Sequence, residues 1–292
     1  MSVPGRLVDV RGEWMHIVER GTGDAGTTPL LLLHGFPSNA FAWRPVAERL
    51  AGSIRSVAID TAGFGYSTRS PRRGVDPDSH ADRVAGVMDA LGIRRADLAG
   101  HSFGGGLAQR FALRHPDRLR RLVLVAPVDA SRRLPLSDGS LMSLFGAMLL
   151  PGLARRIVAR AMRGVAATSG VPADEIAHGY VDPLLLPGTR RVLRRFVRAV
   201  AAAEGIDPSR IAAPTLVIIP GRDRIVAPWV QRALAGRIPN ALLAEVAGAG
   251  HTVQMECPDE VARLIAAFLS PRSEPSGMPA PRRAAGSATG PK

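Results

Sequence analysis

A serine flanked by glycines is the first residue of this sequence that could act as a nucleophile. Ser102 lies in the pentapeptide GHSFG, between Gly100 and Gly104. The preceding residues, ADLAG, read as a strand, and the following residues, FGGGLAQRFALRH, have the apolar spacing of a helix. A sharp turn from strand to helix exposes a serine hydroxyl, and flanking glycines relieve steric collision there. The pattern therefore predicts a nucleophilic serine at position 102.

Two residues in the second half of the chain could complete a catalytic triad with this serine. Asp223 follows the apolar run PTLVIIP, and His251 follows the run ALLAEV. A serine hydroxyl is a weak nucleophile at neutral pH, so an imidazole must take its proton and a carboxylate must orient that imidazole. We expect His251 to be the base and Asp223 to be the acid. Asp129, which follows the strand-like run RLVLVAP, stays open as an alternative acid.

Acyl transfer also needs hydrogen-bond donors for the negative oxygen of its tetrahedral intermediate. The sequence His34-Gly35-Phe36 lies at the end of the apolar run PLLLL. We expect the backbone N–H groups of Phe36 and Phe103 to form this oxyanion hole. His34 and Gly35 are expected to shape its loop.

Apolar runs alternate with amphipathic runs through much of the chain, and this alternation predicts the elements that position the site. Strand-like runs such as PLLLLH, SIRSVAI and RLVLVA are apolar at nearly every position, which is typical of strands buried on both faces. Segments with helical spacing separate them. The sequence therefore predicts an α/β fold, in which a mostly parallel sheet carries helices on both faces. The runs RLVDV and EWMHIVER predict an antiparallel pair at the start.

The interval 129–211 interrupts this alternation, because it contains helical patterns and no convincing strand. We expect this helical insertion to form a lid over the site. Arg190, Arg194 and Arg198 form a stripe beside the apolar side of one lid helix, which predicts a solvated face or a guide for anionic or amphiphilic substrates. The final segment is rich in Pro, Gly, Ser and Ala and is expected to be disordered. The predicted organisation is a first core part at 1–128, the lid at 129–211, a second core part at 212–270 and the tail at 271–292.

The composition narrows the class of protein. The chain has 292 residues, of which 46% are hydrophobic and 22% charged, as in a globular protein. Its single cysteine, Cys257, excludes an internal disulfide. The net charge of +13 comes almost wholly from arginine, and no basic patch carries interleaved aromatic residues. Nucleic acid is therefore not an expected partner.

The sequence gives no reason to expect a cofactor, a metal or a membrane span. No His/Cys/Asp cluster has the spacing of metal ligands, and no G-x-G-x-x-G stands between a strand and a helix. No apolar run reaches the roughly 18 residues that span a bilayer, so stable membrane insertion is not expected. The start of the chain lacks an apolar signal segment, and we expect a cytoplasmic protein. The expected partner is a small-molecule substrate, and the oligomeric state stays open.

The chain resembles the α/β-hydrolase superfamily from about residue 5 to about residue 270. The chain order of Ser102, Asp223 and His251 matches the order of that superfamily's triad. This resemblance implies a mostly parallel eight-stranded sheet with helices on both faces and a helical lid. The sequences HGFPSNAFAWRPVAERL and AIDTAGFGYS are most similar to the branch of epoxide hydrolases and haloalkane dehalogenases.

Two departures from that branch argue against the opening of an epoxide. Those relatives carry aspartate where this chain has Ser102. Epoxide hydrolases also use two lid tyrosines, whereas only Tyr180 lies in the predicted lid. A serine at this position instead resembles the esterases, thioesterases, C–C-bond hydrolases and cofactor-free perhydrolases of the same superfamily.

The activity expected from these residues is the hydrolysis of a small or medium apolar carboxylic ester through an acyl-enzyme. The apolar, arginine-rich lid is the reason for that choice of substrate. The same triad could instead support C–C-bond cleavage, perhydrolysis or acyl transfer. A non-catalytic ligand-binding protein of this fold is the remaining alternative.

Overall fold

A single sheet organises the part of the chain that the structure describes. The computed structural model describes residues 4–22, 28–72, 74–132, 156, 160 and 171–270. The strands are β1 (Arg6–Val10), β2 (Glu13–Arg20), β3 (Leu30–Leu33), β4 (Ser56–Ile59), β5 (Ala96–His101), β6 (Leu119–Val125), β7 (Thr215–Pro220) and β8 (Ala241–Val246). Their order in the sheet is β1-β2-β4-β3-β5-β6-β7-β8. β2 is antiparallel to β1 and β4, and every other neighbouring pair is parallel, so the predicted mostly parallel α/β fold is confirmed.

The sequence of β3 explains its place in the sheet. All four of its leucines are fully buried. Leu31 and Leu33 pack into the core on one face of the sheet, whereas Leu30 and Leu32 pack into the core on the other face. β3 pairs with β4 on one side and with β5 on the other. A strand that is apolar at every position is accommodated in this way because both of its faces are covered.

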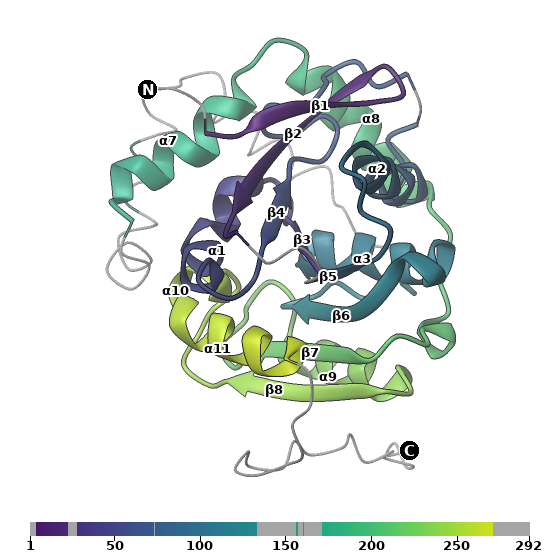
Figure 1. Ribbon diagram of the computed structural model, residues 1–292, viewed down its shortest axis with the longest axis vertical. Helices are drawn as coiled ribbons and strands as arrows, with labels where there is room; N and C mark the ends of the chain where they lie inside the picture. Colours follow the sequence, from purple (N-terminus) through teal and green to yellow (C-terminus); the bar gives the residue numbers. More distant parts are fainter. Residues whose placement is uncertain are drawn as a thin grey trace.

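Helices cover both faces of the sheet (Figure 1). The α-helices are α1 (Arg44–Leu50), α2 (Pro77–Ala90), α3 (Phe103–Arg114), α7 (Ala173–Leu184), α8 (Thr189–Ala202), α9 (Pro228–Arg237), α10 (Val253–Glu256) and α11 (Pro258–Leu269). The short 3-10 helices are η1 (Ala40–Trp43), η2 (Pro116–Arg118) and η3 (Pro208–Arg210). α1 and α11 pack together over one face, and α2 and α3 pack together over the other. No helix of the described residues is long and apolar enough to cross a membrane.

The described part of the predicted lid contains two well-defined helices, α7 and α8. In α8 the predicted apolar side is buried, and the arginine stripe is exposed. Of the two helices predicted at 141–150 and 153–163, only residues 156 and 160 are described, and both are helical. The predicted tail at 271–292 lies outside the described residues. The lid at 129–211 and the other domain boundaries therefore stay predictions.

Candidate active site

Ser102 occupies a strained turn between β5 and α3. Its φ of 52° and ψ of −118° lie in a region that residues with a side chain rarely adopt. A side chain on Gly100 would collide with the backbone of Gly104 one turn into α3, and a side chain on Gly104 would collide with the carbonyl oxygens of Leu33 and His34. The two glycines therefore let helix, strand and oxyanion loop approach closely enough to hold this turn.

The ends of three parallel strands bring Ser102, His251 and Asp223 together. Ser102 follows β5, Asp223 follows β7 and His251 follows β8. His251 Nε2 lies 2.9 Å from Ser102 Oγ, and His251 Nδ1 lies 2.8 Å from Asp223 Oδ2. With the carboxylate accepting from Nδ1–H, Nε2 is the free acceptor that can take the hydroxyl proton. The arrangement has the geometry of a nucleophile, a base and an orienting acid.

The surroundings of Asp223 keep its carboxylate ionised. Burial acts to raise its pKa, but the hydrogen bond from His251 and two backbone N–H groups bring the pKa below its usual value. These N–H groups belong to Ile225 and Val226 and lie 2.8 and 3.0 Å from Oδ1. The side-chain amide of Gln231 donates to Oδ2 at 2.9 Å. An anion held in this way can stabilise the imidazolium that forms when His251 takes a proton.

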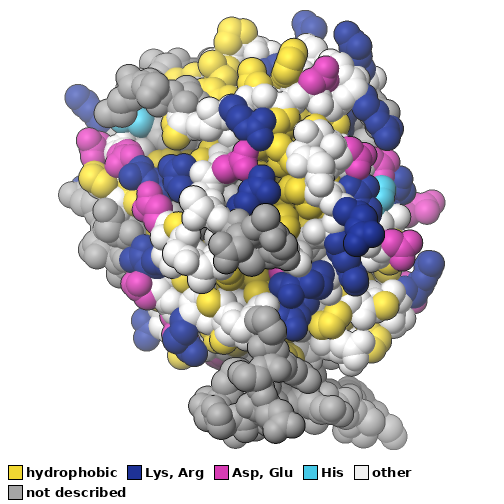
Figure 2. Space-filling view, viewed as in Figure 1, with side chains coloured by type: hydrophobic (Ala, Val, Ile, Leu, Met, Phe, Trp, Pro, Cys, Tyr) yellow, Lys and Arg dark blue, Asp and Glu magenta, His cyan; other side chains and the backbone are white. Residues whose placement is uncertain are grey.

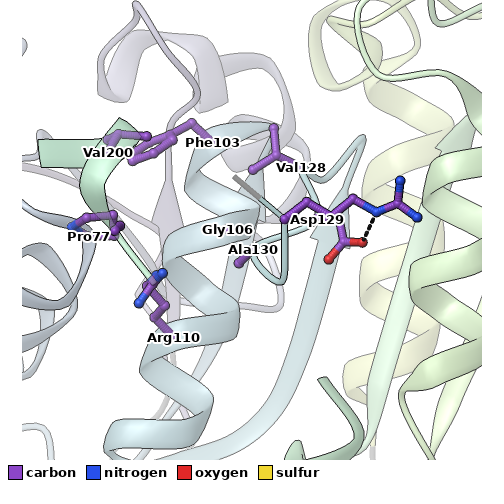
Figure 3. Close-up of a pocket in the computed structure, with 10 residues that line it drawn as sticks. Pro77, Phe103, Gly106, Arg110, Val128, Asp129, Ala130 and Val200 are labelled. Atoms are coloured by element: carbon purple, nitrogen blue, oxygen red, sulfur yellow. Dashed lines mark ion pairs between the residues drawn. The ribbon is translucent and has the colours of Figure 1, made fainter. Parts of the chain in front are cut away.

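Asp129, the alternative acid, is directed elsewhere. Its carboxylate accepts hydrogen bonds from the backbone N–H and hydroxyl of Ser131, at 3.0 and 2.5 Å. It also forms ion pairs with Arg132 at 3.2 Å and Arg237 at 3.6 Å. Figure 3 shows Asp129 at the edge of a small pocket, where a dashed line marks an ion pair of its carboxylate. The structure thus brings Asp223, and not Asp129, into contact with His251.

The predicted oxyanion loop lies close to Ser102. A side chain on Gly35 would come within 3.1 Å of Ser102 Cβ. Phe103 is the first residue of α3, so its N–H has no carbonyl within the helix to bond to. His34 braces the loop, because its Nε2 accepts from the N–H of Thr61 at 3.1 Å and its Nδ1 lies 2.8 Å from the carbonyl oxygen of Gly35. Burial lowers the pKa of His34, so the ring is neutral and suited to this bracing role.

The phenyl rings of the two predicted oxyanion residues form an apolar wall with α8. Phe36 stacks on Phe196 of α8 at 5.2 Å between ring centroids. Phe103 meets the same ring edge-on at 4.9 Å. α8 therefore packs directly over the loops that carry the predicted oxyanion donors.

Two residues that support His251 were not identified from the sequence. The carboxylate of Glu256 accepts from the N–H groups of Gly250 and Thr252, at 2.6 and 3.0 Å, on either side of the histidine. His101 Nε2 lies 2.8 Å from the carbonyl oxygen of His251. Burial lowers the pKa of His101 to about 3, so its neutral ring acts as a donor there. The feature of the sequence that could have pointed to Glu256 is Thr252, four residues before it at the start of a short helix, whose hydroxyl donates to the Glu256 carboxylate.

A cavity of about 30 Å³ lies beside the turn of Ser102 (Figure 3). Phe103 and Gly106 of α3, Val128 after β6 and Val200 of α8 contribute apolar walls to it. This volume accommodates about one or two water molecules.

A buried histidine on α2 makes the stability of this core depend on pH. His80 is 1% exposed, and its ring lies edge-on to Phe196 at 5.7 Å between centroids. Neither of its ring nitrogens has a hydrogen-bond partner among the described residues. Burial, and then the nearby charge of Arg83, lowers the pKa of His80 to about 3.

We expect His80→Leu to reduce the loss of stability in acid. The unfolded chain takes up a proton on this histidine near its ordinary pKa of 6.5, whereas the folded protein takes it up only near 3, so stability falls with pH through that window. Between about pH 7.5 and about pH 5 this linkage costs about 2 kcal/mol. Urea unfolding at both pH values should show a pH dependence that is smaller in the variant by that amount. An unchanged pH dependence would show that His80 is already charged when folded.

The sheet order and the three converging residues define the class of protein. Residues 28–170 match the profile of a family described as the alpha/beta hydrolase fold. The chain is also 33% identical over 279 residues to 2-hydroxymuconate semialdehyde hydrolase of Pseudomonas putida, an alignment that covers 91% of this chain and 94% of that protein. The chain therefore belongs to the α/β-hydrolase family, which confirms the resemblance and the fold implied by it.

Two further relatives refine this placement. The meta-cleavage product hydrolase from Pseudomonas fluorescens superposes with a TM-score of 0.74 at 27% identity, covering 91% of this chain and 97% of that one. Epoxide hydrolase B of Mycobacterium tuberculosis is 34% identical over 134 residues, which are 45% of this chain and 38% of that protein. The similarity to epoxide hydrolases is thus real but covers less than half of the chain.

These comparisons correct the expected substrate. The prediction of an ester hydrolase is wrong, because 2-hydroxymuconate semialdehyde hydrolase, which matches nearly the whole chain at 33% identity, and the superposed meta-cleavage product hydrolase are C–C-bond hydrolases. The physical reason for the error is that a serine triad attacks a carbonyl in both reactions. The motifs around Ser102, Asp223 and His251 therefore do not encode which group leaves.

Proposed function

We propose that this protein hydrolyses a C–C bond in a conjugated 2-hydroxy-6-oxo acid, the kind of compound for which its relatives, such as 2-hydroxymuconate semialdehyde hydrolase and 2-hydroxy-6-oxo-2,4-heptadienoate hydrolase, are named. The observation that carries the proposal is the 33% identity to 2-hydroxymuconate semialdehyde hydrolase along nearly the whole length of both chains. The contacts of Ser102, His251 and Asp223 support it, because they supply the nucleophile, base and acid that the reaction needs.

In the proposed first step Ser102 Oγ attacks the keto carbonyl beside the bond to be broken. His251 Nε2 takes the hydroxyl proton, and Asp223 stabilises the resulting imidazolium. The electron pair of the carbonyl moves to its oxygen. The backbone N–H groups of Phe36 and Phe103 hold this negative oxygen.

In the proposed second step the oxygen restores the carbonyl and the C–C bond breaks. The substrate reaches this step as its 2-oxo tautomer, in which the hydroxyl proton of the 2-hydroxydienoate has moved to the departing carbon. That carbon takes the bonding electron pair, which spreads over the adjacent double bond and the 2-oxo group, and it receives a proton from His251. An acyl group stays on Ser102. Water, deprotonated by His251, then attacks this acyl-enzyme and releases the second acid and the free serine. The reaction consumes one water, and it requires conjugation at the departing carbon because an isolated carbanion is too unstable to leave.

Relative turnover of two substrate classes tests this function. The purified protein should hydrolyse 2-hydroxymuconate semialdehyde or 2-hydroxy-6-oxo-2,4-heptadienoate with a kcat/KM at least about a hundredfold above that for p-nitrophenyl acetate. The loss of dienolate absorbance measures cleavage of the oxo acid. The release of nitrophenolate measures hydrolysis of p-nitrophenyl acetate. Faster turnover of the ester, or no turnover of either keto acid, would overturn the proposal.

A further inference from the structure

The outer face of α8 concentrates positive charge. Its five arginines are all exposed, and none forms an ion pair or hydrogen bond with another described residue. The helix TRRVLRRFVRAVAA contains no acidic residue. With Gly188, these arginines border one open, solvent-filled region of the surface. They are Arg190, Arg191, Arg194, Arg195 and Arg198.

Exposed apolar side chains lie at the same end of the molecule. Leu186, in the turn just before α8, is 36% exposed. Leu7 and Trp14, on the outer face of the β1–β2 hairpin, are 51% and 55% exposed. Figure 2 shows arginine side chains next to hydrophobic ones along the upper edge of the molecule, where Figure 1 places β1, β2 and α8.

The loop that carries Thr68 and Arg69 links the hairpin to the start of α8 through hydrogen bonds. The N–H of Thr68 donates to the carbonyl oxygen of Trp14 at 2.8 Å. The next residue, Arg69, donates through Nε to Thr189 Oγ1 at 3.0 Å. Trp14 is therefore held beside the arginine-bearing helix rather than on an independent arm.

We propose that this face, formed by the five α8 arginines with Leu7, Trp14 and Leu186, docks on the surface of an anionic phospholipid membrane. Guanidinium groups pair well with phosphate, and each basic residue near an anionic surface strengthens binding. Tryptophan and leucine beside such a basic face suit the boundary between headgroups and acyl chains. A nucleic-acid surface would instead place aromatic side chains between the arginines, whereas the aromatic side chain of this face, Trp14, lies on the hairpin and α8 exposes no aromatic side chain.

The opposite side of α8 leaves the candidate active site free during such docking. Val192, Phe196 and Val200 point into the core, where Phe196 contacts Phe36 and Phe103. The membrane would therefore contact the outer surface of the helix whose inner surface covers the oxyanion loop. The docking surface does not depend on which bond the protein hydrolyses.

Vesicle sedimentation tests the proposal with a matched pair of variants. Arg194→Gln/Arg198→Gln removes two charges from α8. Arg94→Gln/Arg210→Gln removes two exposed arginines whose side chains form no ion pair with another described residue. They precede the N-terminal ends of β5 and β7, whereas the triad follows the C-terminal ends of β5, β7 and β8. The probes are vesicles of phosphatidylcholine alone and of phosphatidylcholine mixed with phosphatidylglycerol, at about 0.15 M salt.

The wild type should bind the mixed vesicles and not phosphatidylcholine alone. The α8 variant should bind about thirtyfold more weakly, which is about 2 kcal/mol for two arginines. The control variant should stay within about threefold of wild type. Equal losses in both variants, absence of wild-type binding, or tighter binding to duplex DNA or polyglutamate at the same salt would overturn the proposal.

The fluorescence of Trp14 gives an independent readout of the docked face. Trp43 is fully buried, and Trp229→Phe removes the other exposed tryptophan, so the signal of this variant that responds to lipid comes from Trp14. Mixed vesicles with brominated acyl chains should quench it and shift its emission to the blue. Trp14→Ala should weaken binding with an unchanged urea midpoint. An unquenched Trp14 on protein that sediments with the vesicles would show that another face docks.

Discussion

Ser102→Ala should lower kcat for the proposed C–C cleavage by about five orders of magnitude, as expected when a covalent nucleophile is removed. The variant keeps His251 and Asp223 in place but has no oxygen that can form the acyl-enzyme. The fold should tolerate the change, because alanine is smaller than serine and is no more restricted at a φ of 52°. The free energy of unfolding should therefore change by no more than about 1 kcal/mol. Stopped assays at high enzyme concentration measure kcat, and urea unfolding measures the free energy of unfolding.

Ser56→Ala is the matched control for this variant. Ser56 is also buried, at 1% exposure, but it lies at the start of β4, and its hydroxyl has no hydrogen-bond partner among the described residues. Its loss should leave kcat unchanged. Activity of Ser102→Ala within tenfold of the wild type would rule out this serine as the nucleophile and require a direct attack by water.

The nucleophile and its neighbours could be located from the sequence because local patterns specify them. A strand that is apolar at every position, such as β3, must lie inside a sheet, and the loops after parallel strands meet at one edge. The residues after β5, β7 and β8 were therefore expected to converge, and their side chains do so. The buried side of α8 was likewise encoded by helical spacing, since Val192, Leu193, Phe196 and Val200 all face the core.

The sequence favoured Asp223 as the acid, but it could not exclude Asp129 in this way. Asp129 and Asp223 both follow apolar strands, β6 and β7, which are neighbours in the sheet. What separates them is a set of long-range contacts, because Arg237 of α9 pairs with Asp129 while Gln231 of the same helix donates to Asp223. The spacing of residues along the sequence does not predict such long-range contacts.

The residues that support His251, and the group that leaves in the reaction, could not be predicted from the sequence for a related reason. His101 reaches the carbonyl oxygen of a residue 150 positions away, and Glu256 acts by tightening a loop rather than by matching a motif. The bond that breaks depends on the residues that bind the substrate, and the motifs around the triad do not include those residues. Motifs at Ser102 and His251 therefore predict attack on a carbonyl and leave the bond that breaks undetermined.

Asp223→Asn should lower kcat by about ten-thousandfold, whereas Asp129→Asn should leave it within about tenfold of wild type. Asparagine keeps the size of the side chain, so its amide oxygen can still accept from Ile225 and Val226, but the charge that stabilises the imidazolium is lost. The amide can also donate to Nδ1 and so leave the proton on Nε2, where it cannot accept the hydroxyl proton of Ser102. At position 129 the change weakens pairs with two partly exposed arginines, which affects stability by about 1 kcal/mol or less.

Steady-state turnover of the two asparagine variants, with the free energy of unfolding measured in parallel, separates catalysis from folding. Because the pKa of Asp223 is held below its usual value, the wild-type carboxylate stays charged across the neutral range, so protonation of Asp223 does not explain a loss of turnover as the pH is lowered toward 5. The opposite ranking, with Asp129→Asn inactive and folded, would assign the acid to the loop after β6. That result would require Asp129 to leave Ser131 and Arg132 and reach His251 in the reacting enzyme, a rearrangement that the contacts of both aspartates oppose.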